Sequence, residues 1–273
     1  MSLLSKIADR LVLCPSQHPV DSGDNRRELI WTDNNIEIET WVSSFGDFEN
    51  TPASQRLIVL KIPGTGGRAE RSSIHPAELL TDSKSGSEFA AAETWTLNHR
   101  GYGGSTGPAS LENFVATLES FHDHIESLYP DETKITVGNS LGCLSALYLA
   151  SRKRISGMLL RNPPPLKRLI SKRPKYNWWN FGAAKWVANK IPDELGAIEN
   201  AANARCPVLF VTSEKDRLVP VEYQQQIIDV YGGESRQFIM EGADHGDLLP
   251  EHQQSDYVAA ISELGELLNK FKD

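Results

Sequence analysis

The feature that most constrains the fold is an alternation of short apolar runs with longer stretches of helical periodicity. Runs rich in aliphatic and β-branched residues predict strands buried on both faces, at 57–62, 94–98, 134–137, 157–160, 208–212 and 237–240. An earlier run, 36–43, alternates between polar and apolar residues, which predicts a half-solvated antiparallel strand. Strands that alternate with helices favour the α/β class with one mostly parallel sheet and helices on both faces.

Two amphipathic stretches predict helices that cover this sheet. Apolar residues recur at three- and four-residue steps from Leu111 to Leu128, just before Pro130, and again from Val258 to Phe271. A stripe of this kind is what any helix needs in order to pack on a sheet. We therefore interpret both as packing helices rather than binding surfaces.

The length of 273 residues fits a single α/β domain over 1–273. Residues 162–205 interrupt the pattern, because they begin with a run of prolines and carry tryptophans and weakly helical pieces between two strong strands. We interpret this segment as a short helical lid insertion. An ordinary long crossover connection is the alternative.

A G-x-S-x-G motif at 138–142 follows the run 134–137 directly and precedes a helical stretch. The motif alone is weak, but a tight turn between strand and helix lifts a serine hydroxyl above a sheet, and small neighbours let the two elements pass closely. Ser140 is thus a candidate nucleophile, and the Leu141 N–H at the helix N-terminus a candidate oxyanion donor. The alternative is that Ser140 only caps the helix.

Two later loops supply an acid and a histidine. Asp216 follows the strand 208–212 and His245 follows the strand 237–240, so both are expected at the carboxyl edge of the sheet. A neutral imidazole can accept the serine proton, and a carboxylate behind it stabilises the imidazolium. Rival acids and a second histidine remain in question: Glu214, Asp244, Asp247 and His99.

The glycine-rich loop 63–67 follows the strand 57–62 and allows close backbone approach to a substrate oxygen. Phosphate binding is the alternative interpretation of this loop, although the P-loop and dinucleotide fingerprints are missing.

With these motifs the chain resembles the α/β-hydrolase superfamily, more narrowly its small serine hydrolases of the esterase, thioesterase and lysophospholipase type. Residues 98–105 resemble the family's D-x-R-G-Y-G-x-S turn, which is mostly architectural, and LVLCPS resembles a segment before the hydrolase core. The resemblance implies a triad of Ser140, Asp216 and His245, with Thr65 as the second oxyanion N–H. Two positions depart from the family, Pro63 in place of histidine and Asn98 in place of aspartate.

These residues predict hydrolysis of a carboxylic ester or thioester through an acyl-enzyme on Ser140, with no metal or organic cofactor. A non-catalytic binding or scaffold protein on the same fold is the alternative, because fold does not fix function. No nucleic-acid partner is expected, and the oligomeric state is open.

The formal charge of −8 is unevenly distributed. Residues 134–192 contain 12 Lys and Arg and no Asp or Glu, and this stretch holds both Ser140 and most of the predicted lid. A positively charged mouth would favour anionic acyl substrates. A solvated surface that balances the acidic remainder is the alternative.

The three cysteines, Cys14, Cys143 and Cys206, lie far apart and predict reduced thiols without a zinc site. The sequence shows no apolar run long enough to span a bilayer and no signal peptide pattern, which predicts a cytoplasmic protein. Peripheral membrane contact is an alternative, through apolar N-terminal residues that would otherwise form a core-packing helix: Leu3, Leu4, Ile7, Leu11 and Val12.

Overall fold

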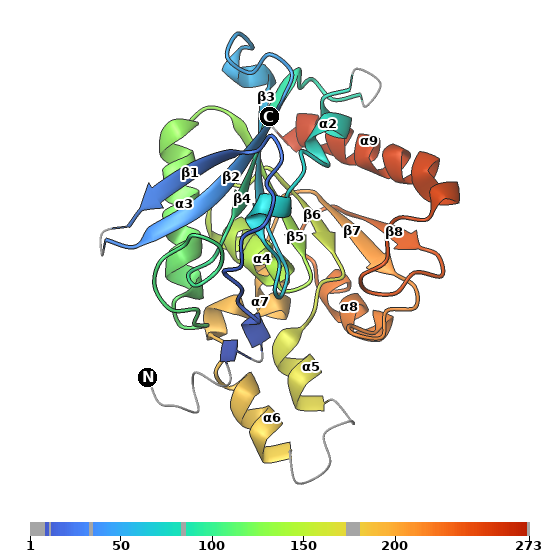
Figure 1. Ribbon diagram of the computed structural model, residues 1–273. Helices are drawn as coiled ribbons and strands as arrows, with labels where there is room; N and C mark the ends of the chain where they lie inside the picture. Colours follow the sequence, from blue (N-terminus) through green and yellow to red (C-terminus); the bar gives the residue numbers. More distant parts are fainter. Residues whose placement is uncertain (1–8, 11, 33–34, 83–85, 173–180, 272–273) are drawn as a thin grey trace.

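The computed structural model describes residues 9–10, 12–32, 35–82, 86–172 and 181–271. Within them one eight-stranded sheet runs through the molecule in the order β1-β2-β4-β3-β5-β6-β7-β8 (Figure 1). The strands are β1 (Arg26–Trp31), β2 (Glu37–Phe45), β3 (Arg56–Ile62), β4 (Ala91–Leu97), β5 (Thr133–Asn139), β6 (Gly157–Arg161), β7 (Val208–Ser213) and β8 (Ser235–Met240).

The sheet is parallel from β4 through β3 to β8, and antiparallel where β2 pairs with β1 and β4. The predicted strands are confirmed, and so is the antiparallel direction of the run 36–43. The sequence analysis did not predict β1, because its charged residues hide the short alternation of polar and apolar positions.

Burial differs from the prediction at both ends of the sheet. The run 237–240 lies in β8, an edge strand that alternates between buried and exposed residues, so the expectation that it is buried on both faces is wrong. In contrast, β2 is more buried than a half-solvated strand, because strands flank it on both sides and Glu39 and Thr40 are buried.

Helices cover both faces of the sheet (Figure 1). One apolar cluster joins the sheet to α3 and α4, and a second cluster joins its other face to α2 and α9. The two predicted packing helices are α3 and α9, with Phe121 and Ile261 fully buried. The helices are α2 (Ala77–Leu80), α3 (Phe114–Leu128), α4 (Gly142–Arg152), α5 (Leu166–Lys172), α6 (Phe181–Ala188), α7 (Ala197–Asn203), α8 (Val221–Ile228) and α9 (Gln254–Phe271), with short 3-10 turns at Ala53–Gln55, Ala69–Arg71, Asp193–Leu195 and Glu251–Gln253.

The segment 162–205 contributes α5, α6 and α7. In Figure 1, α5 and α6 project from the body of the molecule, whereas α7 packs against α4 and α8 within the body. Part of the segment, 173–180, lies outside the described residues. Its role as a lid stays a prediction.

The N-terminal apolar pattern is described only in part. Val12 is buried in the cluster shared with α3 and α4, and Leu3, Leu4, Ile7 and Leu11 lie outside the described residues. No helix in the described part of the chain is both long and apolar enough to cross a membrane.

Candidate active site

Ser140 occupies a strained turn between β5 and α4. Its φ is +51°, a value that non-glycine residues rarely adopt and that costs free energy. Its backbone N–H donates to the Arg161 carbonyl, 2.8 Å away, which fixes the turn to the end of β6. The surrounding structure therefore maintains the strain at this serine.

The two motif glycines are required by close packing around the turn. A Cβ at Gly142 would lie 2.0 Å from the Ile62 carbonyl oxygen, and one at Gly138 would lie 2.7 Å from the Cα of Cys143. Backbone atoms cannot move aside as a flexible side chain can. The motif therefore needs glycine at both positions, because any side chain there would clash with backbone atoms.

The groups that the turn presents are unpaired. Within the described part of the chain, neither the Ser140 hydroxyl nor the Leu141 N–H takes part in a hydrogen bond. The N-terminus of α4 adds a partial positive charge at this point. These groups can therefore meet a substrate carbonyl without first breaking an internal bond.

The glycine-rich loop 63–67 lies directly over the serine. A Cβ built on Gly64 would be 3.3 Å from the Ser140 Cβ and 2.8 Å from the Asn139 carbonyl oxygen. The Thr65 N–H donates to no described residue. The structure thus brings the loop of the second proposed oxyanion donor to the elbow.

The N-terminal segment holds this loop in place. The Thr65 hydroxyl donates to the Val12 carbonyl at 3.1 Å, and the Gly66 N–H donates to the Leu13 carbonyl at 3.0 Å. The Tyr102 hydroxyl also donates to Leu13. The sequence suggested no chemical role for this segment, and the structure gives it a supporting one.

His245 and Asp216 form a close pair beyond the ends of β8 and β7. The His245 Nδ1 lies 2.7 Å from the Asp216 Oδ2, and the Asp216 side chain is fully buried. The other carboxylate oxygen accepts the N–H groups of Leu218 and Val219, and Gln224 donates to Oδ2. A carboxylate held in this way fixes the orientation and tautomer of the imidazole.

The rival acids are engaged elsewhere. Asp244 forms an ion pair with Arg217, and these contacts, with the N–H groups of Arg217 and His245, lower its pKa to about 2. Glu214 accepts the Gly242 N–H, and Asp247 accepts the Asp244 N–H. Of the candidates, Asp216 is the acid that bonds the His245 ring.

The serine turn and the histidine loop are connected through the Asn162 side chain rather than by a direct bond. Among the described residues, no hydrogen bond links the Ser140 hydroxyl to the His245 ring. Asn162 connects their surroundings, because its Nδ2 donates to the His245 carbonyl at 3.2 Å and to the Ser213 hydroxyl at 3.0 Å. Asn162 directly follows Arg161, whose carbonyl accepts the Ser140 N–H.

Sequence reasoning placed Asn162 only at the start of the lid. The residue is fully buried, has a φ of +52° and accepts the Ser213 N–H at 2.8 Å. An asparagine just before a run of prolines is a signal that could have identified it, since asparagine tolerates positive φ better than most residues.

The turn 98–105 carries a separate polar network. Asn98 Nδ2 donates to both Glu39 and Glu70 at 2.8 Å, and its Oδ1 accepts the Ala69 N–H. Arg68 forms an ion pair with Glu70. Asparagine suits this position better than the family's aspartate, because two carboxylates already face it.

His99 is buried beside this network. Its ring stacks on Phe114 with centroids 3.6 Å apart, and neither ring nitrogen has a partner in the described part of the chain. Burial lowers the pKa of His99 to about 3, so the ring is neutral. The structure does not connect His99 to His245 or Asp216 by any hydrogen bond among the described residues.

The described residues contain no group of three or more His, Cys, Asp or Glu side chains that could hold a metal ion. Cys143 and Cys206 are buried free thiols, and Cys14 is exposed.

The family model described as "alpha/beta hydrolase fold" matches residues 77–184, which include the elbow. A match of this kind, together with the eight-stranded sheet, decides the assignment. The chain has the α/β-hydrolase fold.

Two solved structures share this fold over most of their length. The Pyrococcus furiosus esterase PF2001 superposes with a TM-score of 0.64 at 18% identity, covering 95% of this chain and 97% of that one. Est1E from Butyrivibrio proteoclasticus superposes with a TM-score of 0.61 at 16% identity, covering 90% and 99%. At these identities the likeness shows the fold.

A curated α/β hydrolase is also similar in sequence. The α/β hydrolase domain-containing protein aho-3 of Caenorhabditis elegans is 22% identical over 156 residues. The match covers 56% of this chain and 44% of aho-3, which is less than half of the relative's length.

Proposed function

We propose that this protein is a serine hydrolase that cleaves carboxylic ester or thioester bonds through an acyl-enzyme on Ser140. The observation that carries the proposal is the buried 2.7 Å pair of His245 and Asp216 at the same sheet edge as a serine on a strained elbow. An esterase and Est1E are among the proteins with the same fold, which supports the same reaction class.

In the first step the Ser140 hydroxyl attacks the carbonyl carbon, and the His245 Nε2 accepts its proton. The negative charge on the carbonyl oxygen is stabilised by the N–H groups of Leu141 and Thr65, which are free of internal bonds. His245 then gives the proton to the leaving group. Water attacks the acyl-enzyme in the second step, with His245 again as the base.

Asp216 has a fixed role in both steps. Its carboxylate keeps the proton on Nδ1, so that Nε2 faces the serine as an acceptor, and it stabilises the imidazolium after proton transfer. The His245 side chain is 18% accessible, which leaves it room to turn Nε2 toward the serine hydroxyl when substrate binds.

The proposal is tested by replacing Ser140 with alanine. Turnover of an activated aryl ester should fall by about 10⁴-fold or more, because the covalent step is lost while the fold remains. A fluorophosphonate probe should label the unmodified protein and fail to label Ser140→Ala.

Ser120→Ala on α3 is the matched control and should keep full labelling. Retention of more than a few per cent of the activity by Ser140→Ala would show that another group is the nucleophile.

A further inference from the structure

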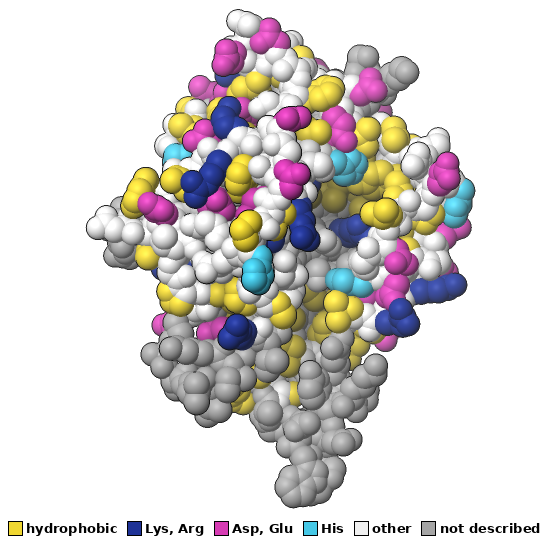
Figure 2. All heavy atoms as spheres, viewed as in Figure 1, with side chains coloured by type: hydrophobic (Ala, Val, Ile, Leu, Met, Phe, Trp, Pro, Cys, Tyr) yellow, Lys and Arg dark blue, Asp and Glu magenta, His cyan; other side chains and the backbone are white. Residues whose placement is uncertain are grey.

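A cavity of about 470 Å³ lies beside the elbow, between α2 and α9. Figure 2 shows a hollow in this part of the surface that is lined mainly by hydrophobic side chains. Its floor is the carboxyl end of the sheet, and its size is that of a small-molecule site. The residues of its apolar lining are Leu79, Val137, Leu159, Val211, Met240, Leu249 and Val258.

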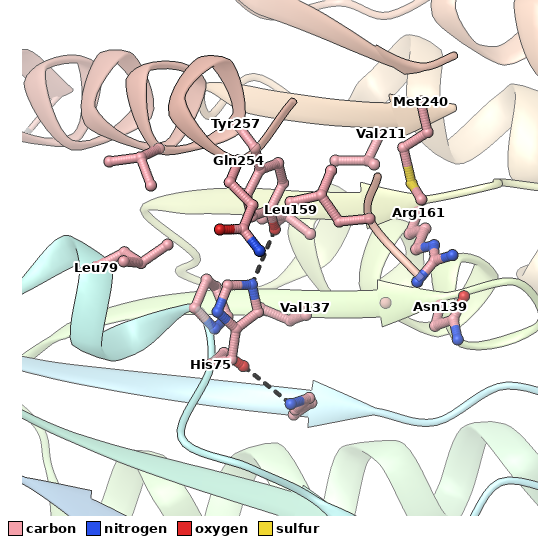
Figure 3. A pocket seen from close by; sticks show the side chains of 15 residues that line it. His75, Leu79, Val137, Asn139, Leu159, Arg161, Val211, Met240, Gln254 and Tyr257 are labelled. Carbon is pink, nitrogen blue, oxygen red and sulfur yellow. Dashed lines mark hydrogen bonds between the residues drawn. The ribbon is translucent and has the colours of Figure 1, made fainter. Parts of the chain in front are cut away.

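The cavity has two different ends. Figure 3 shows Asn139 and Arg161 together at one end, with Leu79 of α2 at the other. Asn139 and Arg161 are register partners of β5 and β6, and Asn139 directly precedes Ser140. A ligand that lies along the cavity therefore has one terminus next to the elbow.

Arg161 is a partly buried cation, and burial lowers the pKa of its guanidinium against the opposing effect of Tyr257, Asp216 and Asp247. It forms no ion pair with any residue in the described ranges. The guanidinium makes a single hydrogen bond, from Nη2 to the Asp247 carbonyl, and its Nε is buried without a partner. A half-buried charge with unsatisfied donors is costly unless a ligand completes it.

Two of the other titratable groups of the cavity, Lys61 and His75, already have hydrogen-bond partners. Lys61 Nζ donates to the carbonyls of Ser73 and His75 at 3.1 and 2.9 Å, and burial lowers the pKa of Lys61 to about 8. His75 bonds Glu78 through Nδ1 and the Tyr257 hydroxyl through Nε2. No Asp or Glu is among the described residues that line the cavity, and the nearby carboxylates Asp216, Asp247 and Glu78 lie outside its lining.

We propose that this cavity binds an apolar chain that ends in a carboxylate, with the carboxylate on Arg161. The proposal rests on the proposed function, since the occupant is the acyl chain of the substrate and, after hydrolysis, the free acid. It names the substrate class as esters or thioesters of aliphatic carboxylic acids, and Arg161 as the residue that retains the acid product.

A carboxylate fits this site better than a phosphate. The planar fork of one guanidinium matches the two oxygens and the single charge of a carboxylate. A phosphate dianion would need a second free cation, and the Lys61 amine is held by two carbonyls.

The test measures binding rather than turnover, in the Ser140→Ala protein, by calorimetry. Fatty acids from butanoate to hexadecanoate are compared with the primary amides of the same length. Each carboxylate should bind about tenfold or more tightly than its amide, because only the carboxylate makes charge-assisted bonds. Affinity should rise with chain length and then stop rising once the chain reaches Leu79.

Three variants make the result specific. Arg161→Met should abolish the preference for the carboxylate, Arg161→Lys should retain part of it, and Arg168→Met, an exposed arginine on α5, should leave it unchanged. A melting curve of each variant verifies that it is folded. Because Arg161 also holds Asp247, the carboxylate-to-amide ratio is the decisive measurement, and a merely structural role would not change it.

Equal binding of acid and amide, or a preference that survives in Arg161→Met, would overturn the proposal. Labelling of Ser140 by a fluorophosphonate is independent of these measurements. The nucleophile assignment and the binding assignment can therefore fail separately.

Discussion

Two polar clusters at the carboxyl edge of the sheet are built on opposite principles. In the cluster of Glu39, Glu70 and Asn98, the amide of Asn98 is fully bonded, with both carboxylates and a backbone N–H as its partners. In the elbow cluster, the Ser140 hydroxyl and the Leu141 N–H bond to no described residue. Saturated groups hold the fold together, whereas unsaturated groups are available to a ligand.

Arg161 and Asp216 show the same contrast between neighbouring strands. Asp216 accepts hydrogen bonds from Leu218, Val219, Gln224 and His245, while the guanidinium of Arg161 makes one hydrogen bond and its Nε is unpaired. The Asp216 carboxylate is positioned to act on a protein group, whereas the Arg161 guanidinium is available to the carboxylate of the acid product.

The largest expected effect is that of Asp216→Asn. The amide can still be held by Leu218 and Val219, but it no longer enforces the correct imidazole tautomer, so kcat should fall by about 10³–10⁴-fold with little change in melting temperature. Initial rates on an aryl ester and a thermal melt measure the two effects.

Asp244→Asn is the matched control for this comparison. Asp244 pairs with Arg217 away from the imidazole ring, and its replacement should change kcat by less than tenfold. A loss as large as that of Asp216→Asn would show that the two carboxylates are not distinguished as their bonds suggest.

The next effect is on stability and comes from Asn98→Asp. A third carboxylate would lie against Glu39 and Glu70, and the uncompensated buried charge should lower the free energy of unfolding by about 3 kcal/mol at pH 8. The deficit should shrink as the pH falls toward 5, because a protonated aspartate can donate as the amide does. Urea denaturation at both pH values measures it.

Asn189→Asp, at an exposed position just after α6, controls for the added charge and should be neutral. If Asn98→Asp leaves the free energy of unfolding unchanged at pH 8, the Asn98 amide does not stabilise the fold by bonding Glu39 and Glu70.

The smallest expected effect is on the pH dependence of stability and comes from His99, which is buried with neither ring nitrogen bonded. His99 lies outside the elbow, so it tests whether an unsaturated group must take part in the chemistry. Its pKa is about 3 in the folded protein against an ordinary value of 6.5. The unfolded chain therefore binds the proton first, and the stability present above pH 6.5 is lost as the pH falls toward 3. At pH 5 the loss from this group should be about 2 kcal/mol.

His99→Phe keeps the stacking on Phe114 and should remove this contribution. The measurement is the difference in unfolding free energy between pH 8 and pH 5 for both proteins, so that titrating carboxylates cancel. Identical pH dependence in the two proteins would mean that His99 is charged or solvated in the folded state. A large loss of kcat would place His99 in the chemistry.

Local sequence patterns predicted the parallel strands and the helices α3 and α9 because apolar periodicity is written directly in the chain. The same patterns missed β1, whose RRELIW contains three charged residues, and misjudged β8, which is an edge strand. Whether a strand is central or at an edge depends on its neighbours in the sheet, and those are set by pairing between distant segments.

The candidate site divides in the same way. The sequence alone determined the α/β architecture and the identities of Ser140, Asp216 and His245 as candidates, since each follows a strand that ends at the same edge of the sheet. Only the tertiary structure decided that Asp216 rather than Asp244 bonds the imidazole, that Asn162 connects the elbow to the histidine loop, and that the Arg161 Nε is buried without a partner. Hydrogen bonds and burial depend on distances between residues far apart in the chain, and periodicity carries no information about those distances.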